Sequence, residues 1–535
     1  MQRLLVALSA IALLASLLGS AAAIHQHSGQ TFGAVSGLPD PALDPRPLGL
    51  AVNVALEQYA DLDPVLESLP GFRWLRQTFS WNEIEPTRGE YDWVKWDAIV
   101  SAAKAHDKEI IAVLNFSPAW AVGSQSPNHL HSGEASASPE HVTQSPNPPT
   151  DFAAFASAFA ARYADSIDVY QIWDEPNISL GWGGQPPSAA SYAALLQAAY
   201  AAIHAADPHA TVLAAALAPN VETGPDNLSD LLYLQQLYDL GAGAYFDAAA
   251  GKPYGFYTGP DDRLADPAVL NFSRFALLRQ VMVRNGDGRK LLWGGNFGWN
   301  TLDSPWGKVT PVQQVQYTLA AYQRAQDEWP WAGPLALESY QPSAGVPSDD
   351  PPWGFALAGP SGQPGPLLQR LSSTSNSNAY ATPGNHPAQS PSARYFGDWE
   401  FSDLGADIPE NYAGARIEIT FRGTDLALKV RRSDYRGYLY VAVDGRPANL
   451  LPRDGRGAYL VLTAPQLMPE VVTLPVASGL APDQPHMAVI HPERGWDQWA
   501  FVGFSVGRRL SDRDFKLALG LLAAVAFTSA AGVLI

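Results

Sequence analysis

The feature that most constrains the fold of this chain is an eightfold alternation of short apolar runs with longer amphipathic stretches. The runs have strand length, whereas the stretches between them, such as 152–164 and 192–206, have helical periodicity. The predicted strands are 48–54, 72–79, 109–116, 168–175, 211–220, 244–250, 290–297 and 333–339. This pattern predicts an α/β protein with a (β/α)8 barrel, or TIM barrel, over residues 45–371. A doubly wound sheet is the alternative, although no glycine-rich phosphate loop follows the first run.

The pattern changes after the predicted barrel. Residues 372–392 are rich in Ser, Asn and Pro, which is typical of a linker. Residues 393–507 consist of short alternating runs separated by turns such as Asp444-Gly445, and they predict an all-β sandwich, jelly-roll-like in its arrangement. Residues 122–150, rich in Ser, Pro and His, follow the third predicted strand, where an active-site loop is expected.

The two ends of the chain are apolar. Arg3 precedes an apolar run and Ala21-Ala22-Ala23 forms a small-residue cleavage site, so residues 1–23 are predicted as a secretory signal peptide, with an uncleaved anchor as the alternative. Residues 517–535 carry no charge and are predicted as a C-terminal transmembrane helix, with a buried terminal helix as the alternative. We therefore expect an exported protein at the cell surface, anchored in the membrane by the C-terminal helix.

Four basic residues precede that helix and would lie on the exported side, against the positive-inside tendency. The topology of the helix is therefore left open. These residues are Arg508, Arg509, Arg513 and Lys516.

Composition limits the partners and the chemistry that this chain can use. With 34 basic and 52 acidic side chains, the net charge is −18, which argues against nucleic acid as a partner. The 16 Trp and 21 Tyr residues are compatible with binding of neutral carbohydrate. The absence of cysteine excludes thiolate chemistry and disulfides, and the eleven His residues are scattered, so no metal or cofactor is predicted. The sequence does not indicate the oligomeric state.

The segment QIWDEPN (171–177) contains the clearest chemical signal. Its apolar run ends in two adjacent carboxylates, Asp174 and Glu175, followed by Pro176. Adjacent carboxylates repel each other and are costly to desolvate, so packing alone does not explain them. In a barrel, the carboxyl ends of the strands build the active site. A second, distant carboxylate is therefore expected.

Three motifs together resemble the clan A glycoside hydrolases, in particular the family 39-like and family 5-like members. They are the strand end W-x-E-P-N, the segment WLRQTFSWNEIEPTRGEYDW with Arg76, and PAW after the third strand. The resemblance covers residues 48–371 and implies hydrolysis of O-glycosidic bonds of a carbohydrate at the cell surface. It assigns the acid/base role to Glu175. Such hydrolysis uses one carboxylic acid to protonate the leaving oxygen and a second carboxylate as nucleophile or base.

The sequence departs from the family at the second carboxylate. The nucleophile is expected at the end of the seventh strand, where this chain has Asn296. Asp174 replaces an Asn that binds the sugar 2-hydroxyl, and Lys252 replaces a His before Pro-Tyr. Glu338, at the end of the eighth strand, is the candidate second carboxylate. The alternative for Glu338 is a structural acid paired with Arg76 or Lys252.

The resemblance also implies a set of residues that contact sugar. For the Trp and Tyr residues of this set, core packing is the alternative. In the sandwich, four aromatic residues either form a platform that stacks on sugar or pack in the core: Tyr438, Tyr440, Trp496 and Trp499. Because the expected nucleophile is missing, a catalytically inactive glycan-binding protein is the second functional prediction, and a structural envelope protein is the third. The predicted substrate-binding residues are Arg76, Trp120, Asp174, Lys252, Tyr254, Asn296 and Trp299.

Overall fold

The first folded unit is a closed barrel of parallel strands, which confirms the predicted (β/α)8 architecture and excludes the doubly wound sheet. The computed structural model describes all residues except 1, 48, 123–145, 147, 375–379 and 535. Within the described residues, eight strands pair in sequence order and the eighth closes on the first. They are β1 (Leu50–Asn53), β2 (Phe72–Ser80), β3 (Glu109–Asn115), β4 (Val169–Ile172), β5 (Thr211–Leu217), β6 (Ala248–Gly251), β7 (Leu292–Phe297) and β8 (Ala332–Leu337).

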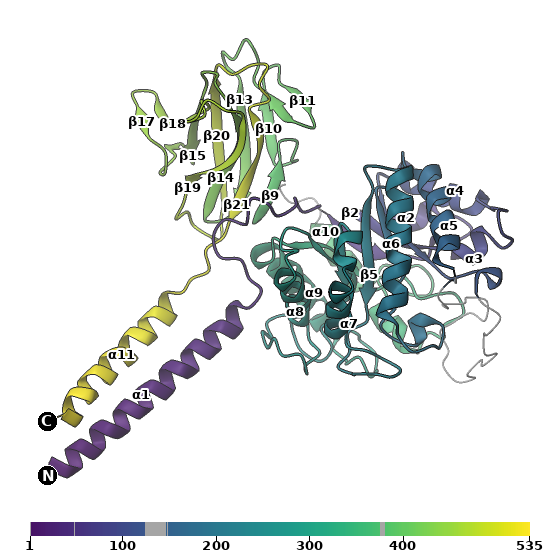
Figure 1. Cartoon of the computed structure of the whole chain (residues 1–535), viewed down its shortest axis with the longest axis horizontal. Helices are drawn as coiled ribbons and strands as arrows, with labels where there is room; N and C mark the ends of the chain where they lie inside the picture. Colours follow the sequence, from purple (N-terminus) through teal and green to yellow (C-terminus); the bar gives the residue numbers. More distant parts are fainter. Residues whose placement is uncertain (1, 48, 123–145, 147, 375–379, 535) are drawn as a thin grey trace.

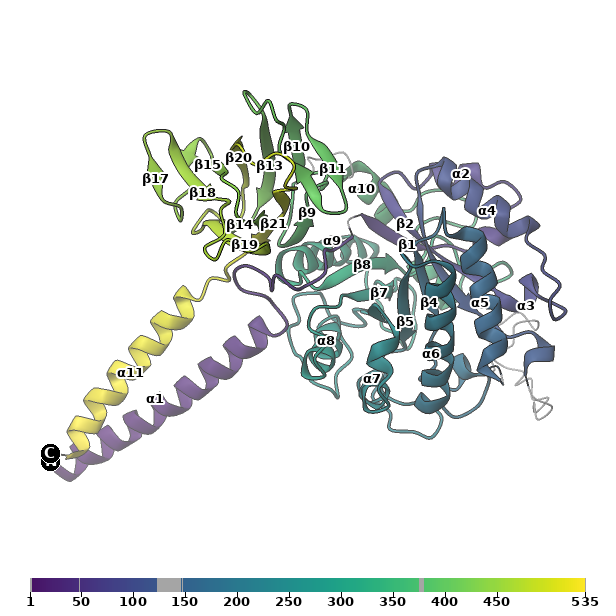
Figure 2. The ribbon, with the colours of Figure 1, turned by 45° about the horizontal axis from the view of Figure 1, so that its top comes forward.

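Helices surround this barrel, as Figure 2 shows. Their inward faces are apolar, and they cover strands that are buried on both sides, which is typical of parallel sheets. They are α2 (Asp63–Glu67), α3 (Trp81–Ile84), α4 (Val94–Ala105), α5 (Pro149–Tyr163), α6 (Ala189–Ala206), α7 (Asp230–Asp239), α8 (Arg274–Arg284), α9 (Pro311–Glu328) and α10 (Pro366–Thr374).

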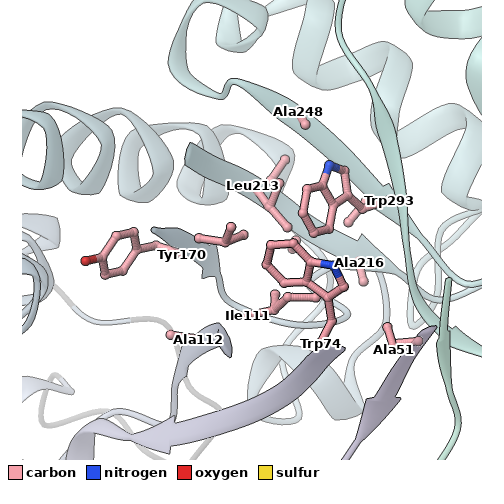
Figure 3. Packing of buried hydrophobic residues seen from close by; sticks show 14 of the residues in the cluster. Ala51, Trp74, Ile111, Ala112, Tyr170, Leu213, Ala216, Ala248 and Trp293 are labelled. Carbon is pink, nitrogen blue, oxygen red and sulfur yellow. The ribbon is translucent and has the colours of Figure 1, made fainter. Parts of the chain in front are cut away.

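Two tryptophans form a central contact of the barrel core. Figure 3 shows Trp74 of β2 and Trp293 of β7 pointing toward one another, and their rings meet edge to face with centroids 5.6 Å apart. Small residues around them, including Ala216 and Ala248, leave room for the indoles. Gly333 is needed for the same reason, because a Cβ there would lie 2.7 Å from the Trp293 ring.

The second folded unit is the predicted β-sandwich. Among the described residues, one sheet has the order β10-β13-β20-β15-β18-β17 with β16 beside β15, and the other has the order β11-β12-β21-β14-β19 with β9 beside β21. All pairings are antiparallel. Alternate residues of β13 and β15 are buried, which gives the two sheets apolar inner faces.

The strands of this sandwich begin earlier than the predicted domain boundary, because β9 lies inside the segment predicted as a linker. Their bounds are β9 (Gly384–Pro387), β10 (Ala393–Phe396), β11 (Glu400–Ser402), β12 (Gly405–Asp407), β13 (Arg416–Arg422), β14 (Asp425–Arg432), β15 (Tyr438–Val443), β16 (Arg446–Pro447), β17 (Arg453–Asp454), β18 (Gly457–Val461), β19 (Glu470–Ala477), β20 (Pro485–Glu493) and β21 (Phe501–Gly507).

The sandwich aromatics considered as a sugar platform lie outside its buried core. Tyr438 and Tyr440 lie on the half-exposed face of β15, where both contact the ring of Tyr459 edge-on or tilted. Trp496 is 40% exposed. Core packing is therefore wrong for these residues, and their use as a sugar platform stays a prediction.

Two long apolar helices leave the folded body side by side. They are α1 (Gln2–Thr31) and α11 (Arg513–Leu534), and Figure 1 shows both chain ends at the far tip of the pair. Both are long and apolar enough to cross a membrane, by length and composition. They fit the predicted N-terminal signal peptide and C-terminal helix.

An extended segment after α1, residues 32–47, touches both folded units, and we call it the strap. Arg46 of the strap donates to Thr382 Oγ1 at 2.6 Å, and Asn385 of β9 donates to the carbonyls of Asp40 and Leu43. A direct contact also joins the units, because Arg422 of β13 donates to both carboxylate oxygens of Asp327 in α9 at 3.0 Å. The sandwich is thus fixed to the barrel through charged side chains and the strap.

Candidate active site

The turn that follows β4 has an unusual backbone. Trp173 and Glu175 have φ angles of 67° and 51°, in the left-handed region that costs a residue with a side chain about 1–3 kcal/mol. Between them, Asp174 bridges to Ala216 of β5, and the Glu175 amide donates to the Ala216 carbonyl at 3.1 Å. Both carboxylates are therefore held at the carboxyl end of β4, as the predicted strand end requires.

Close packing fixes this turn. The Trp173 indole is fully buried and donates to the Gly181 carbonyl at 2.9 Å. A Cβ on Gly181 would lie 2.2 Å from the Glu175 carbonyl oxygen, so only glycine fits there. Asn177 donates to the Ala218 carbonyl and accepts from the Ala218 amide, both at 2.8 Å. The motif E-P-N therefore ends in a residue that ties the turn to the strand end of β5.

Two buried cations hold the paired carboxylates. Arg76 of β2 bonds Asp174 at 2.7 Å, while Lys252, which follows β6, bonds Asp174 at 3.0 Å and Glu175 at 2.7 Å. Burial raises the pKa of Asp174, but the charges of Arg76 and Lys252 outweigh it and hold that pKa below its usual value. Burial lowers the pKa of Lys252, and the neighbouring carboxylates raise it above its usual value. Asp174 is thus an anion and Lys252 a cation at neutral pH.

Glu338 lies one residue beyond β8 and is held by neutral donors. Asn296 donates to Glu338 Oε2 at 2.9 Å, and the Tyr254 hydroxyl donates to the same oxygen. Burial raises the pKa of Glu338 above its usual value, against the lowering effect of Lys252, Tyr254 and Asn296, and the charge of Glu175 adds to the rise. Burial beside Glu338 raises the pKa of Tyr254 well above its ordinary value, so the hydroxyl keeps its proton.

Asn296 links the two halves of the site. Its side-chain oxygen accepts from Arg76 at 3.3 Å while its amide nitrogen donates to Glu338, so the amide has one defined orientation. At the position where the resemblance expects the nucleophile, this chain therefore places a residue that orients another carboxylate. Among the described residues, no ion pair joins Glu338 to Arg76 or Lys252, so the alternative of a structural salt bridge is not realised.

Most of the residues predicted for the site meet in this network: Arg76, Asp174, Glu175, Lys252, Tyr254, Asn296 and Glu338. Trp299 is only 1% exposed, donates to the Thr258 carbonyl at 2.7 Å and packs against Gly255. Trp120 donates to the Glu85 carbonyl at 3.0 Å, and the Arg88 guanidinium covers its ring at 4.9 Å. Both tryptophans have the packing contacts that the alternative expects, and sugar contact by either stays a prediction.

Two further polar residues belong to the network although the sequence did not single them out. Asn53 of β1 accepts from Arg76 at 2.7 Å, and Gln171 of β4 accepts from Arg76 at 3.1 Å and donates to Asp174 at 3.1 Å. Each is a polar residue inside an otherwise apolar run, which is the signal that could have identified it. The predicted loop 122–150 lies for the most part outside the described residues. In the part of the chain that the structure describes, no group of three His, Asp or Glu side chains is placed to hold a metal ion.

Residues 63–205 match the family model of glycoside hydrolase family 42, described as beta-galactosidase. The match includes Arg76, Trp120, Asp174 and Glu175, while Asn296 and Glu338 lie beyond it. The resemblance to clan A glycoside hydrolases is thereby confirmed, and the substitution at Asn296 is not covered by the match. No curated protein matches the chain in sequence.

Several solved structures are similar to this chain at low sequence identity. A family 39 glycoside hydrolase from the gut symbiont Bacteroides cellulosilyticus WH2 is 16% identical, with 81% of each chain covered and a TM-score of 0.49. Endo-glycoceramidase II from Rhodococcus sp. is 16% identical, with 86% of this chain and 100% of that chain covered and a TM-score of 0.42. A glucosidase from Croceicoccus marinus is 13% identical, with 86% and 99% covered and a TM-score of 0.43.

Proposed function

We propose that the protein is a glycoside hydrolase that cleaves O-glycosidic bonds of a carbohydrate at the cell surface, with Glu175 as acid/base and Glu338 as the second carboxylate. The observation that carries this proposal is the network that joins the two carboxylates across the barrel mouth, from the end of β4 to the end of β8. A carboxylate pair at one barrel mouth is what glycoside hydrolysis needs.

The surroundings of each carboxylate suit a different role. Glu338 receives two hydrogen bonds from neutral donors, which favour its anion against the opposing effect of burial, and an anion is needed for a nucleophile or for a base that activates water. Glu175 is 29% exposed at the strand end, so it can reach the leaving oxygen of a bound glycoside. Asp174, held as an anion by Arg76, can accept a hydrogen bond from a sugar hydroxyl.

The second candidate function is glycan binding without turnover. The observation that favours it is the Lys252 ammonium, which bonds Glu175 at 2.7 Å. A general acid must present its carboxyl group to the leaving oxygen, whereas here Lys252 occupies Oε1 of Glu175. Under the first proposal, substrate binding must displace Lys252 from Glu175, whereas under the second the ion pair persists.

Hydrolysis rates on one alkyl glycoside and one nitrophenyl glycoside distinguish the hydrolase from the glycan-binding protein. We expect Glu175→Gln to reduce kcat by about 100-fold or more on an alkyl glycoside, because general acid catalysis contributes about 10²–10⁴-fold. On a nitrophenyl glycoside the loss should be smaller, because that leaving group departs without a proton. This difference separates loss of an acid from a general loss of structure.

The matched control is Glu222→Gln, an exposed glutamate whose side chain accepts from Asn227, and its rates should equal those of the wild type. Equal rates for wild type and Glu175→Gln would exclude the hydrolase. Glycan binding by calorimetry without turnover of either substrate would instead establish the second candidate.

A further inference from the structure

The N-terminal helix is longer than a secretion signal requires. The apolar core of a signal peptide has about 7–15 residues, whereas about 20 residues cross a bilayer. In this chain no Asp, Glu, Lys or Arg occurs between Arg3 and Asp40, and the apolar span runs over 26 residues, Val6–Thr31. The predicted cleavage site at Ala21–Ala23 lies inside the continuous helix α1. The length of α1 is therefore that of a membrane span.

Helix α1 packs along α11 in the antiparallel sense. The His27 ring stacks on the Phe515 ring with centroids 3.9 Å apart, and a Cβ on Gly19 would lie 3.1 Å from the Leu522 side chain. Ser16 of α1 is only 3% exposed. Small residues at the crossing allow two helices to approach closely, which is the usual form of helix pairing in membranes.

The other faces of both helices are apolar and uncovered. A large apolar surface in water is unfavourable and marks an interaction site. Because these side chains face outward around both helices along their length, a bilayer matches the surface better than a single groove-binding partner. The exposed side chains are Leu8, Ile11, Leu14, Leu17, Leu18 and Ile24 of α1 and Leu517, Leu521, Val525, Phe527 and Val533 of α11.

The two helices leave the body at one point. The Gln30 carbonyl at the end of α1 accepts from Arg263, and the Gly33 carbonyl accepts from the Trp331 indole at 2.8 Å. The strap residue Gly37 then donates to the carbonyl of Arg508, shortly before α11 begins, at 2.8 Å. Cleavage after Ala23 would leave only residues 24–31 of α1 beside α11 and would remove the contact of Gly19 with Leu522.

We propose that α1 is retained after export and that α1 and α11 cross the bilayer together as an antiparallel pair. The folded body then lies on the exported side, and the distal ends of both helices lie in the cytoplasm. This is the uncleaved-anchor alternative, extended to a two-helix anchor whose partner surface is the lipid bilayer. The proposal is independent of the proposed enzyme activity.

The charge distribution agrees with this topology. Arg3 lies in the first turn of α1, and the next Lys or Arg after it is Arg46, so the positive-inside tendency places the Arg3 end of this helix in the cytoplasm. Large domains translocate largely regardless of their charge. The basic residues before α11 therefore do not set the orientation, and two of them are bound to the body: Arg508 pairs with Asp327 and Arg509 with Asp425.

Because the chain has no cysteine, single cysteines report the topology without background. In cells that make the full chain, a membrane-impermeant maleimide should label Met468→Cys, a 66% exposed position of the sandwich, without permeabilisation. It should label Gln2→Cys only after permeabilisation. If α1 is removed, the mature Gln2→Cys protein contains no cysteine and is never labelled. Labelling of Gln2→Cys in intact cells would also overturn the proposed topology.

A second experiment tests the helix pair itself. Oxidation of the double variant Gly19→Cys/Leu522→Cys should form an intramolecular disulfide in most molecules, because these residues face each other. The matched control is Leu18→Cys/Leu521→Cys, at the adjacent positions, which are 63% and 71% exposed and should not cross-link within one chain. No cross-link in the first variant, or equal cross-linking in both, would contradict the pair.

Discussion

At the scale of residues, the candidate site contains two carboxylates that follow different strands, Glu175 after β4 and Glu338 after β8. An amide at position 296 cannot form a glycosyl ester, and its position suits it to orient Glu338 instead. Asp174, Glu175, Lys252 and Glu338 could be predicted because each is a charged residue at a strand end, whereas Arg76 lies inside β2 and was predicted from the resemblance. Asn53 and Gln171 were missed because their role depends on Arg76, which is distant in sequence. The burial of Trp299 depends on contacts with Gly255 that local sequence does not reveal.

The raised pKa of Glu338 predicts that its buried anion lowers the stability of the folded state at neutral pH, although the proposed function needs this carboxylate. Because the folded state binds this proton more tightly than the unfolded state, the stabilisation is present at low pH and is lost as pH rises through the folded-state pKa. We expect Glu338→Gln to raise the free energy of unfolding at pH 7 by on the order of 1 kcal/mol, because single stabilising substitutions commonly contribute an amount of this size. The gain should shrink at pH 4.

Urea unfolding at both pH values measures this effect, and glycoside hydrolysis by the same variant should be lost. Glu222→Gln, at an exposed position, should leave stability unchanged at both values. A gain of equal size at pH 4 and pH 7 would show that the charge of Glu338 is not its cause.

At the scale of elements, the barrel strands could be predicted because their signal is local. Each observed strand lies within a predicted run or within one residue of it, and the main differences are trimmed ends. The run 168–175, for example, gives a regular strand only to Ile172, because Trp173 and Glu175 leave extended geometry. The short strands β9 to β12 were not predicted. β9 is stabilised by the distant strand β21, and β11 and β12 have only three residues each. The turn that contains Asp174 and Glu175 thus begins where the strand pattern ends.

The same turn makes Gly181 a sensitive position. Gly181→Ala places a Cβ 2.2 Å from the Glu175 carbonyl oxygen, so the turn must shift. We expect a loss of about 100-fold in kcat, since a displacement of about 1 Å has that effect, and a destabilisation of about 1–3 kcal/mol. Steady-state kinetics with thermal unfolding measures both.

Gly288→Ala is the control, because the nearest atom to its added Cβ is 4.0 Å away and its backbone is not left-handed. It should change kcat by less than twofold. Wild-type activity in Gly181→Ala would show that the position of the turn does not determine catalysis.

At the scale of the whole molecule, the sequence predicted two units and apolar ends but not how they are joined. The sequence predicted a linker between the units, and the structure adds the strap and Asp327, which also join them. These contacts join residues that lie far apart in the chain, such as Asp327 and Arg508, so no local pattern reveals them. The acidic composition and the cysteine-free chain remain compatible with this assembly.

Asp327 is the residue on which this junction depends most. It bonds Arg422 at 3.0 Å and Arg508 at 3.2 Å, and its side chain is 11% exposed. We expect Asp327→Asn to lower stability by about 2 kcal/mol, less than the loss for a fully buried pair, because both arginines keep some contact with solvent. In calorimetry the barrel and the sandwich should then unfold in separate transitions.

Asp483→Asn removes an exposed partner of Arg508 and should change the melting temperature by less than 1 °C, since exposed pairs contribute little. A single unchanged transition in Asp327→Asn would show that the strap alone couples the two units.

The strap meets the barrel at the end opposite to the candidate site. Trp331, which bonds the strap, precedes β8, whereas Glu338 follows it, and six strand residues separate the two by about 20 Å. Figures 1 and 2 both show α3, next to the carboxyl end of β2, on the side of the barrel farthest from α1 and α11. The strap therefore contacts the barrel at the end of β8 opposite to Glu338, so this contact does not cover the candidate site.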